Sequence, residues 1–207
     1  MNGYSFFNRL AYKANTLPPK LKLDHQDPLA SQKLSSNLGK HLLHLNSNNV
    51  RPVAVVAIGT DRSTGDSLGP LTGSKLKEFA IPDLSIYGTL DDPVHASNMI
   101  DKLRQLEKDL NNPIIIAIDA CLGQSESVGS ITLSAGPVRP GAGVNKSLPT
   151  IGHVHYTGIV NVSGYMEYFV LQNTRLSIVM RMATLISTSI MLGIRKVRTS
   201  SNAYLVQ

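Results

Sequence analysis

The sequence predicts a single α/β domain with a central, mostly parallel sheet and helices on both faces. Two short runs, 53–58 and 114–118, consist of consecutive apolar and largely β-branched residues. Strands without a polar face are typical of parallel sheets buried between two layers of helices. Between these runs lie two segments, 69–79 and 93–110, in which apolar residues recur at helical spacing. Strands that alternate with helices in this way predict βαβ units with parallel strands.

The remaining elements follow from shorter patterns. A third strand is expected at 84–87, between the two helical segments. Residues 128–134 partly alternate and are expected to form an antiparallel strand, and 153–162 are also expected to form a strand. Asp27 and Pro28 form a typical helix start, which predicts a helix that ends near residue 45. A long helix is expected from 165 to about 192.

The chain has 207 residues, which suits one domain with a sizeable core. Residues 1–28 are polar and contain proline, so a flexible N-terminal arm is expected, followed by the domain at 29–195 and a tail at 196–207. A single cysteine, Cys121, excludes an intrachain disulfide and a cysteine-based zinc site. Because no secretory signal is recognisable and Arg181 interrupts the most apolar stretch, a soluble, cytoplasmic protein is expected.

The net charge of +6 favours acidic partners only weakly. The basic residues do not cluster, and no nucleic-acid-binding motif accompanies them. Neither nucleic acid nor a membrane is therefore expected as a partner.

Acidic residues follow each of the three expected parallel strands. Asp61 and Asp66 come after the first strand, Asp91 after the second, and Asp119 directly after the third. Ligands of open α/β sheets bind outside the carboxyl ends of the strands, so these side chains are expected at one edge. Carboxylates that meet at a partly dry edge repel each other, and at least one then holds its proton more tightly. Such a pair meets the requirement for a general acid and a general base.

Several of these acids also have structural interpretations. Asp61 can brace its loop, Asp91 can be a solvated loop residue, and Asp66 can cap the helix that it opens. Asp119 is the hardest to explain structurally, because it directly follows a buried strand. The sequence therefore favours a site built around Asp66 and Asp119.

The segment 136–149 is rich in glycine and proline and is expected to form a loop over the site. Within it Gly141, Gly143 and Asn145 are candidate substrate-binding residues. The stretch that ends in Lys146 looks like a phosphate-binding loop, but Asn145 stands where that motif has glycine. A substrate-covering loop is therefore favoured over nucleotide binding.

Further candidates for substrate binding are Thr60 and Asp61, Asp91, and His155 on the last strand. A metal site is an alternative, in which Asp66, Asp119 and His155 bind a divalent ion. The structural interpretation of His155 is a histidine satisfied within its strand. Cys121 is interpreted as a small buried side chain rather than a nucleophile.

Five segments together resemble the YyaC-type sporulation proteins of spore-forming bacteria, over about residues 53–182. In order they are IGTDRSTGDSLGP (58–70), YGTLDDPVHA (87–96), AIDACLG (117–123), PGAGVNK (140–146) and GIVNVSG (158–164). That family is similar, more distantly, to the germination protease of spores and to the peptidases that trim hydrogenase large subunits. The resemblance implies a three-layer, phosphorylase/hydrolase-like α/β fold.

The resemblance also implies a catalytic pair. The germination protease has one aspartate before Ala-Leu-Gly-Pro, matched here by Asp66, and a second in an Ile-Asp-Ala segment, matched by Asp119. The hydrogenase-trimming peptidases add a histidine, for which His155 is the candidate. The germination protease is longer and carries a prosegment that has no clear counterpart here.

The leading hypothesis is an aspartate-dependent peptidase that acts on a protein in sporulation or germination, inside the forespore or spore core. One carboxylate would activate water, and the other, protonated, would polarise the scissile carbonyl and donate to the leaving amine. A coupled pair titrates as a unit, so the sequence does not assign the two roles. The alternatives are a metal-linked maturation peptidase and a non-catalytic spore binding protein of the same fold. The oligomeric state stays open.

Overall fold

The computed structural model describes residues 17–46, 50–141 and 148–204 of the chain. Its elements are, in chain order, β1 (Leu21–Asp24), α1 (Ala30–Leu45), β2 (Val53–Ala57), the short 3₁₀ turn η2 (Gly65–Ser67), α2 (Leu68–Glu78), β3 (Leu84–Tyr87), α3 (Met99–Asp109), β4 (Ile114–Gly123), the 3₁₀ turn η3 (Ser125–Ser127), β5 (Ser130–Ala135), β6 (Val154–Val162), α4 (Glu167–Gln172) and α5 (Leu176–Tyr204).

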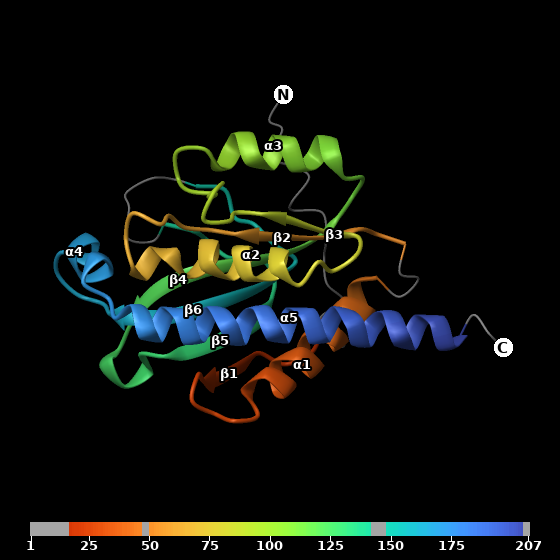
Figure 1. Ribbon diagram of the computed structural model, residues 1–207, viewed down its shortest axis with the longest axis horizontal. Helices are drawn as coiled ribbons and strands as arrows, with labels where there is room; N and C mark the ends of the chain where they lie inside the picture. The colour runs from red at the N-terminus through yellow and green to blue at the C-terminus, as the bar shows by residue number, and fades with distance from the viewer. Residues whose placement is uncertain (1–16, 47–49, 142–147, 205–207) are drawn as a thin grey trace.

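The elements form three layers, which Figure 1 shows from the side. A six-stranded sheet with the order β1-β5-β6-β4-β2-β3 lies in the middle. The strands β3, β2, β4 and β6 run parallel, whereas β5 runs antiparallel to both of its neighbours. Helices α1, α2 and α5 pack on one face and α3 on the other. The fold class expected from the sequence is confirmed.

The core is divided by the sheet. On one side, the leucines of α1 and α2 and the apolar stripe of α5 pack against β2, β4, β5 and β6. On the other side, Met99, Leu103 and Leu106 of α3 pack against the opposite face of β2 and β4. Burial of one such side chain stabilises the fold by about 1.5–3 kcal/mol, so both layers hold the central strands in place. This is why β2 and β4 are apolar along their whole paired length.

Two glycines let helix α2 begin directly against the end of β2. A Cβ atom on Gly69 would overlap the carbonyl of Ile58, and one on Gly59 would overlap the carbonyl of Asp66. Gly59 also has a φ of +139°, in the region that side chains rarely adopt. The close backbone contact fixes the position of Asp66 relative to the strand edge.

The beginning of the described chain is more ordered than the sequence suggests. Residues 21–24 fall within the expected flexible arm, yet they pair with β5 as an edge strand, with Leu21 opposite Leu133 and Leu23 opposite Ile131. Both leucines pack against the main core. In this strand leucine alternates with lysine and aspartate, but four residues are too few for the alternation to predict a strand.

The long helix expected at 165–192 is two helices. Helix α4 ends at Gln172, and α5 begins at Leu176 and continues through the expected tail to Tyr204. The break is stabilised by side chains, because the Thr174 hydroxyl donates to the Val170 carbonyl (2.9 Å) and the Asn173 amide donates to the Phe169 carbonyl (2.8 Å). The side chains of threonine and asparagine can replace helical backbone hydrogen bonds in this way and end a helix. The spacing of apolar residues does not show at which threonine or asparagine a helix ends.

Helix α5 is the most apolar long element. The stretch Leu176–Thr199 is long and apolar enough to cross a membrane by length and composition. However, more than half of its most apolar window is buried inside the domain, where it packs against α1 and α2. A core helix of an α/β domain has these same properties.

Candidate active site

The strand order reverses between β2 and β4, and the candidate site lies at the carboxyl end of this strand pair. From β2 the chain moves outward to β3 through α2, and then returns through α3 to β4 on the other side of β2. Open α/β sheets bind ligands in the crevice at such a switch point. Asp66 follows β2 and Asp119 belongs to β4, so both of the expected catalytic residues lie at this switch point.

Asp119 lies inside β4 and not at its end, which corrects the expectation from the sequence. The β2–β4 pairing ends at Ala57 and Ile118, whereas β4 continues along β6, with Asp119 opposite Thr157. Asp119 is therefore the first β4 residue beyond the end of β2. It is only 8% exposed.

Asp66 stands in the short turn η2 between β2 and α2. Its backbone carbonyl accepts a hydrogen bond from the Thr60 N–H (3.2 Å), which closes the loop 60–66 onto itself. The turn places the side chain in a half-buried position. Asp66 does not occupy the capping position of α2, because it lies within η2 and the N-cap residue of α2 is Ser67.

The two carboxyl groups differ in their electrostatic environments. Burial raises the pKa of Asp119 well above its ordinary value, and the nearby Asp66 carboxylate raises it further. Burial also raises the pKa of Asp66, but a backbone N–H of Thr60 and the imidazole of His95 oppose this rise. The pKa is therefore raised at both carboxyl groups, strongly at Asp119 and less at Asp66, where the Thr60 N–H and His95 oppose the effect of burial.

His95 is a site residue that the sequence analysis missed. The sequence predicts a helix from 93, but α3 begins only at Met99, and Val94 instead forms a bridge with Ile58 at the end of β2. This extended segment carries His95 to Asp66. The Nδ1 atom of His95 accepts the N–H of Ser97 (3.3 Å), so the neutral ring carries its proton on Nε2. The one sequence feature that could have indicated His95 is its position in the segment 87–96, which is one of the five that resemble YyaC-type proteins.

The expected substrate-binding residues are only partly assembled at the crevice. Thr60 is half-buried beside Asp66, and Asp61 is exposed on the same loop. Asp91 is exposed on a turn that is closed by a hydrogen bond from the Leu90 N–H to Ser74 on α2 (2.9 Å). Of these three residues Thr60 therefore lies beside Asp66, whereas Asp61 and Asp91 face solvent.

The long loop is described only at its ends. Gly141 is half-buried and has a φ of +71°, which requires glycine. Gly143 and Asn145 lie outside the described residues.

His155 contacts the backbone and not the expected pair of aspartates. Its Nδ1 lies 2.8 Å from the Gly136 carbonyl, and burial together with the charge of Lys20 lowers its pKa. Among residues 17–46, 50–141 and 148–204, no three histidine, cysteine or acidic side chains are grouped as metal ligands. The triad of Asp66, Asp119 and His155 is therefore not assembled, and the interpretation of His155 as a satisfied strand histidine fits its contacts.

Cys121 follows Asp119 by two residues on the same strand. Its thiol lies 3.5 Å from the Gly158 carbonyl, and burial raises its pKa to about 11. Only the thiolate is an effective nucleophile, so Cys121 is unsuited to nucleophilic catalysis at neutral pH.

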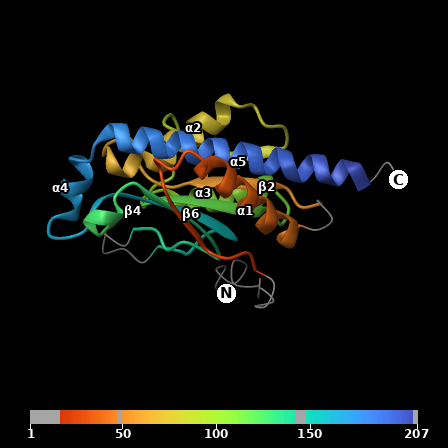
Figure 2. The same ribbon diagram turned by 90° about the horizontal axis from the view of Figure 1, so that it is seen from below.

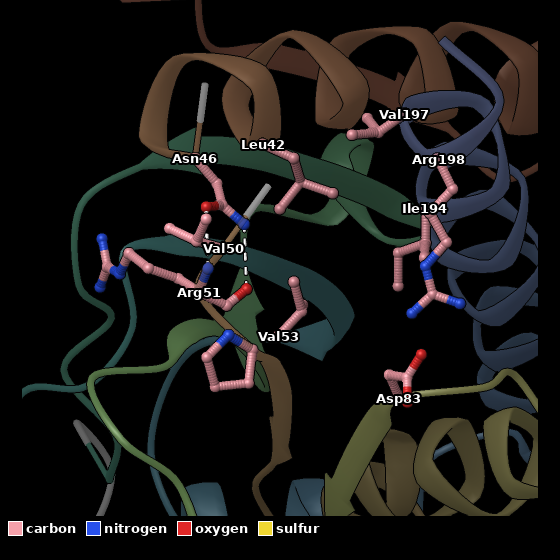
Figure 3. Close-up of a pocket in the computed structure, with 10 residues that line it drawn as sticks. Leu42, Asn46, Val50, Arg51, Val53, Asp83, Ile194, Val197 and Arg198 are labelled. Carbon is pink, nitrogen blue, oxygen red and sulfur yellow. Dashed lines mark hydrogen bonds between the residues drawn. The ribbon is translucent and has the colours of Figure 1, made fainter. Parts of the chain in front are cut away.

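A separate pocket lies at the opposite edge of the sheet, where β2 begins. It has a volume of about 290 Å³, and Figure 3 shows its lining side chains, which include Leu42, Val53 and Ile194 on the apolar side. Asn46 shapes one wall, because its amide donates to the Arg51 carbonyl (2.9 Å). Among the described residues that line it, Asp83 is the only one with a carboxylate. This pocket therefore does not contain the carboxyl pair.

The fold and the site together define a three-layer α/β domain with two unequal carboxyl groups at its switch point. The family model described as "Protein of unknown function (DUF1256)" matches residues 22–189, and the chain belongs to this family. It is 51% identical over 173 residues to a Bacillus subtilis (strain 168) protein named "Uncharacterized protein YyaC", which covers 84% of this chain and 83% of that protein. The resemblance to YyaC-type proteins is confirmed.

Among solved structures, the chain is similar to the [NiFe] hydrogenase maturation protease HycI from Thermococcus kodakarensis KOD1. The TM-score is 0.43 and the identity is 17%, over 68% of this chain and 94% of that chain.

Proposed function

We propose that this protein is a peptidase that cleaves a protein substrate with Asp66 and Asp119 as its catalytic pair. One observation carries the proposal: two carboxyl groups lie at the switch point of the sheet in unlike surroundings. Asp119 is the more buried, whereas the Thr60 N–H and His95 oppose the effect of burial at Asp66. Environments that push two carboxyl pKa values apart are what acid–base catalysis by a carboxyl pair requires.

The asymmetry of the pair supports a division of roles. Asp119, buried and beside a like charge, is the protonated partner; Asp66, beside a backbone N–H and His95, is the ionised one. In the first step a water oxygen adds to the scissile carbonyl carbon, Asp66 accepts a proton from that water, and the Asp119 proton passes to the carbonyl oxygen. In the second step the C–N bond breaks, the leaving amine takes the proton from Asp66, and Asp119 regains its proton from a hydroxyl of the intermediate. The pair returns to its starting state.

His95 has a positioning role in this proposal. The imidazole beside Asp66 lowers the pKa of the carboxyl group that must accept the proton, without touching the scissile bond. Substitution of His95 by glutamine removes this contribution, so the acidic limb of the pH–rate profile is expected to move to higher pH.

The test of the proposal uses an acid-soluble protein extract from spores as the substrate mixture. Wild type, Asp66→Asn, Asp119→Asn and the control Asp101→Asn, which lies on the exposed face of α3, are incubated with the extract and new fragments are identified by mass spectrometry. Fragments from the wild type and the control only are expected. Undiminished cleavage by both active-site variants would refute the carboxyl pair, and absence of cleavage by the wild type would favour a non-catalytic binding protein.

A role in sporulation or germination, inside the forespore or spore core, is part of the same proposal. It is supported by the resemblance of the five sequence segments to sporulation proteins. A fluorescent fusion expressed in a spore-forming bacterium is expected to accumulate in the forespore, and uniform fluorescence in vegetative cells only would contradict it.

A further inference from the structure

Large apolar side chains are exposed on and around α4, at the same end of the molecule as the candidate site. Figures 1 and 2 both show α4 at one end, with the last turns of α5 at the other. We define the α4 surface by five residues, with their exposed fractions: Tyr165 (99%), Met166 (65%), Tyr168 (64%), Phe169 (53%) and Leu176 (56%). The rings of Tyr168 and Phe169 pack edge to face, with centroids 5.9 Å apart. Apolar patches of this kind on soluble proteins mark binding surfaces.

The exposed side chains stand on an anchored scaffold. The Asn161 amide, at the end of β6, donates to the Val170 carbonyl (3.1 Å) and to the Thr174 hydroxyl (3.2 Å). On its inner side, α4 presents Leu171, whose side chain lies directly against the backbone of Gly65. The α4 surface is therefore held in place from beneath, which reduces the entropy that a partner would lose on binding.

The α4 surface is continuous with the turn that carries Asp66. Gly65 is the residue before Asp66, and any side chain at this position would meet Leu171 and Thr174. A polypeptide bound on α4 therefore needs to extend only across this turn to reach the carboxyl pair.

The charges beside the α4 surface select the chemistry of the partner. Arg62 lies on the loop before Gly65, and Arg175 is the residue before Leu176; both are exposed. Within the described part of the chain, neither guanidinium has an ion pair or a side-chain hydrogen bond. The one carboxylate on α4 is Glu167, which is half-buried. Two unpaired cations beside an apolar patch fit a segment that carries apolar and acidic side chains.

We propose that the α4 surface docks an apolar, acidic segment of the protein substrate and thereby delivers the adjoining backbone to Asp66 and Asp119. The partner is a substrate only if the protein is a peptidase, so this inference rests on the proposed function. Binding energy at α4 is made away from the scissile bond, so its loss raises KM and leaves kcat nearly unchanged.

Binding is tested apart from cleavage in the Asp119→Asn background. The probe is a fluorescein-labelled 15-residue peptide in which Phe and Leu alternate with Asp, and its affinity is measured by fluorescence anisotropy. Saturable binding is expected, at least tenfold tighter than for the same peptide with Lys in place of Asp or with Ser in place of Phe and Leu.

Variants on the protein side locate the surface. The double variant Tyr165→Ser/Phe169→Ser is expected to weaken binding at least tenfold, and Arg62→Gln/Arg175→Gln severalfold, with a reduced dependence on salt. The matched control Leu43→Ser/Val50→Ser removes two exposed apolar side chains far from the site and is expected to leave the affinity unchanged. Far-UV circular dichroism confirms that each variant retains its fold.

Three results would overturn the proposal: no saturable binding of the acidic peptide, unchanged binding by Tyr165→Ser/Phe169→Ser, or a wild-type dimer in sedimentation velocity that this double variant converts to a monomer. The last result would assign the surface to a second copy of the chain. Failure of the docking proposal is distinct from failure of the peptidase proposal. Cleavage with an unchanged KM in the double variant refutes only the docking surface, and peptide binding without cleavage of any protein refutes only the peptidase.

Discussion

Replacing Asp119 by asparagine is expected to stabilise the fold at neutral pH and not at acid pH. Asparagine has nearly the same shape, and its amide oxygen can still accept the backbone hydrogen bond that Asp119 accepts at Ala120. The substitution therefore removes the charge and the titration, and little of the packing. Because Asp119 is buried and beside Asp66, the folded state of the wild type resists its ionisation.

The sign and size of the effect follow from proton linkage. The pKa of Asp119 is raised in the folded state, so between its ordinary value of 3.8 and the folded-state value the unfolded chain releases a proton that the folded chain keeps. The free energy of unfolding of the wild type then falls as pH rises, by at most about 1.4 kcal/mol per pH unit from this one group. The asparagine variant lacks this loss, so its relative stability increases across the same window and is constant below it.

The assay is urea unfolding followed by far-UV circular dichroism at half-unit steps from pH 3.5 to pH 8, since the chain contains no tryptophan. Asp66 titrates in both proteins, so the difference between them isolates Asp119 to first order. The control Asp101→Asn, on an exposed side chain, is expected to give a flat difference curve. A flat curve for Asp119→Asn as well, or one that falls with pH, would show that the folded state does not resist ionisation of Asp119, and the assignment of Asp119 as the protonated partner would be wrong.

Two further predictions concern the close packing and the thiol beside the site. Gly69→Ala places a methyl group on the Ile58 carbonyl and is expected to lower the free energy of unfolding by about 2 kcal/mol or more, with Gly164→Ala, whose Cβ would meet nothing within 4 Å, as the control. Equal thermal stability of the two variants would contradict the close contact between α2 and β2. Alkylation of Cys121 by iodoacetamide at pH 8 is expected to be about a hundredfold slower in the folded protein than in urea, because the thiolate fraction falls with a pKa of about 11. Mass spectrometry measures both rates, and equal rates would show an accessible, ordinary thiol.

The sheet and the two acidic positions could be predicted because their signals are local. A run of apolar residues such as 53–58 has few alternatives other than a strand buried on both faces, and βαβ order then fixes parallel pairing. The carboxyl ends of parallel strands share one edge, so Asp66 and Asp119 were expected together before any tertiary contact was known. The antiparallel strand β5 was also predicted, and its pairing with β6 confirms it.

What could not be predicted depends on where neighbouring elements end. The sequence shows Asp119 after an apolar run, but only the strand pairing in the folded protein shows that β4 continues along β6 after β2 has ended. The position of His95 depends in the same way on α3, which begins at Met99 because Val94 bridges to Ile58. Histidine is a common metal ligand, but the ring of His155 is instead hydrogen-bonded to the backbone carbonyl of Gly136.

The difference between the two aspartates is therefore a tertiary property, although their residue type is the same. Asp119 lies on β4 beyond the end of β2, where β4 still pairs with β6, and its side chain is buried, which removes water from this carboxyl group. The loop 60–66 closes on itself and brings a backbone N–H to the other, while the bridge at Val94 brings His95 beside it. Burial favours the neutral acid, and the N–H and the imidazole favour the carboxylate, so the two carboxyl groups hold their protons with unequal strength. This inequality arises from the surroundings of two identical residue types and is therefore not visible in the sequence.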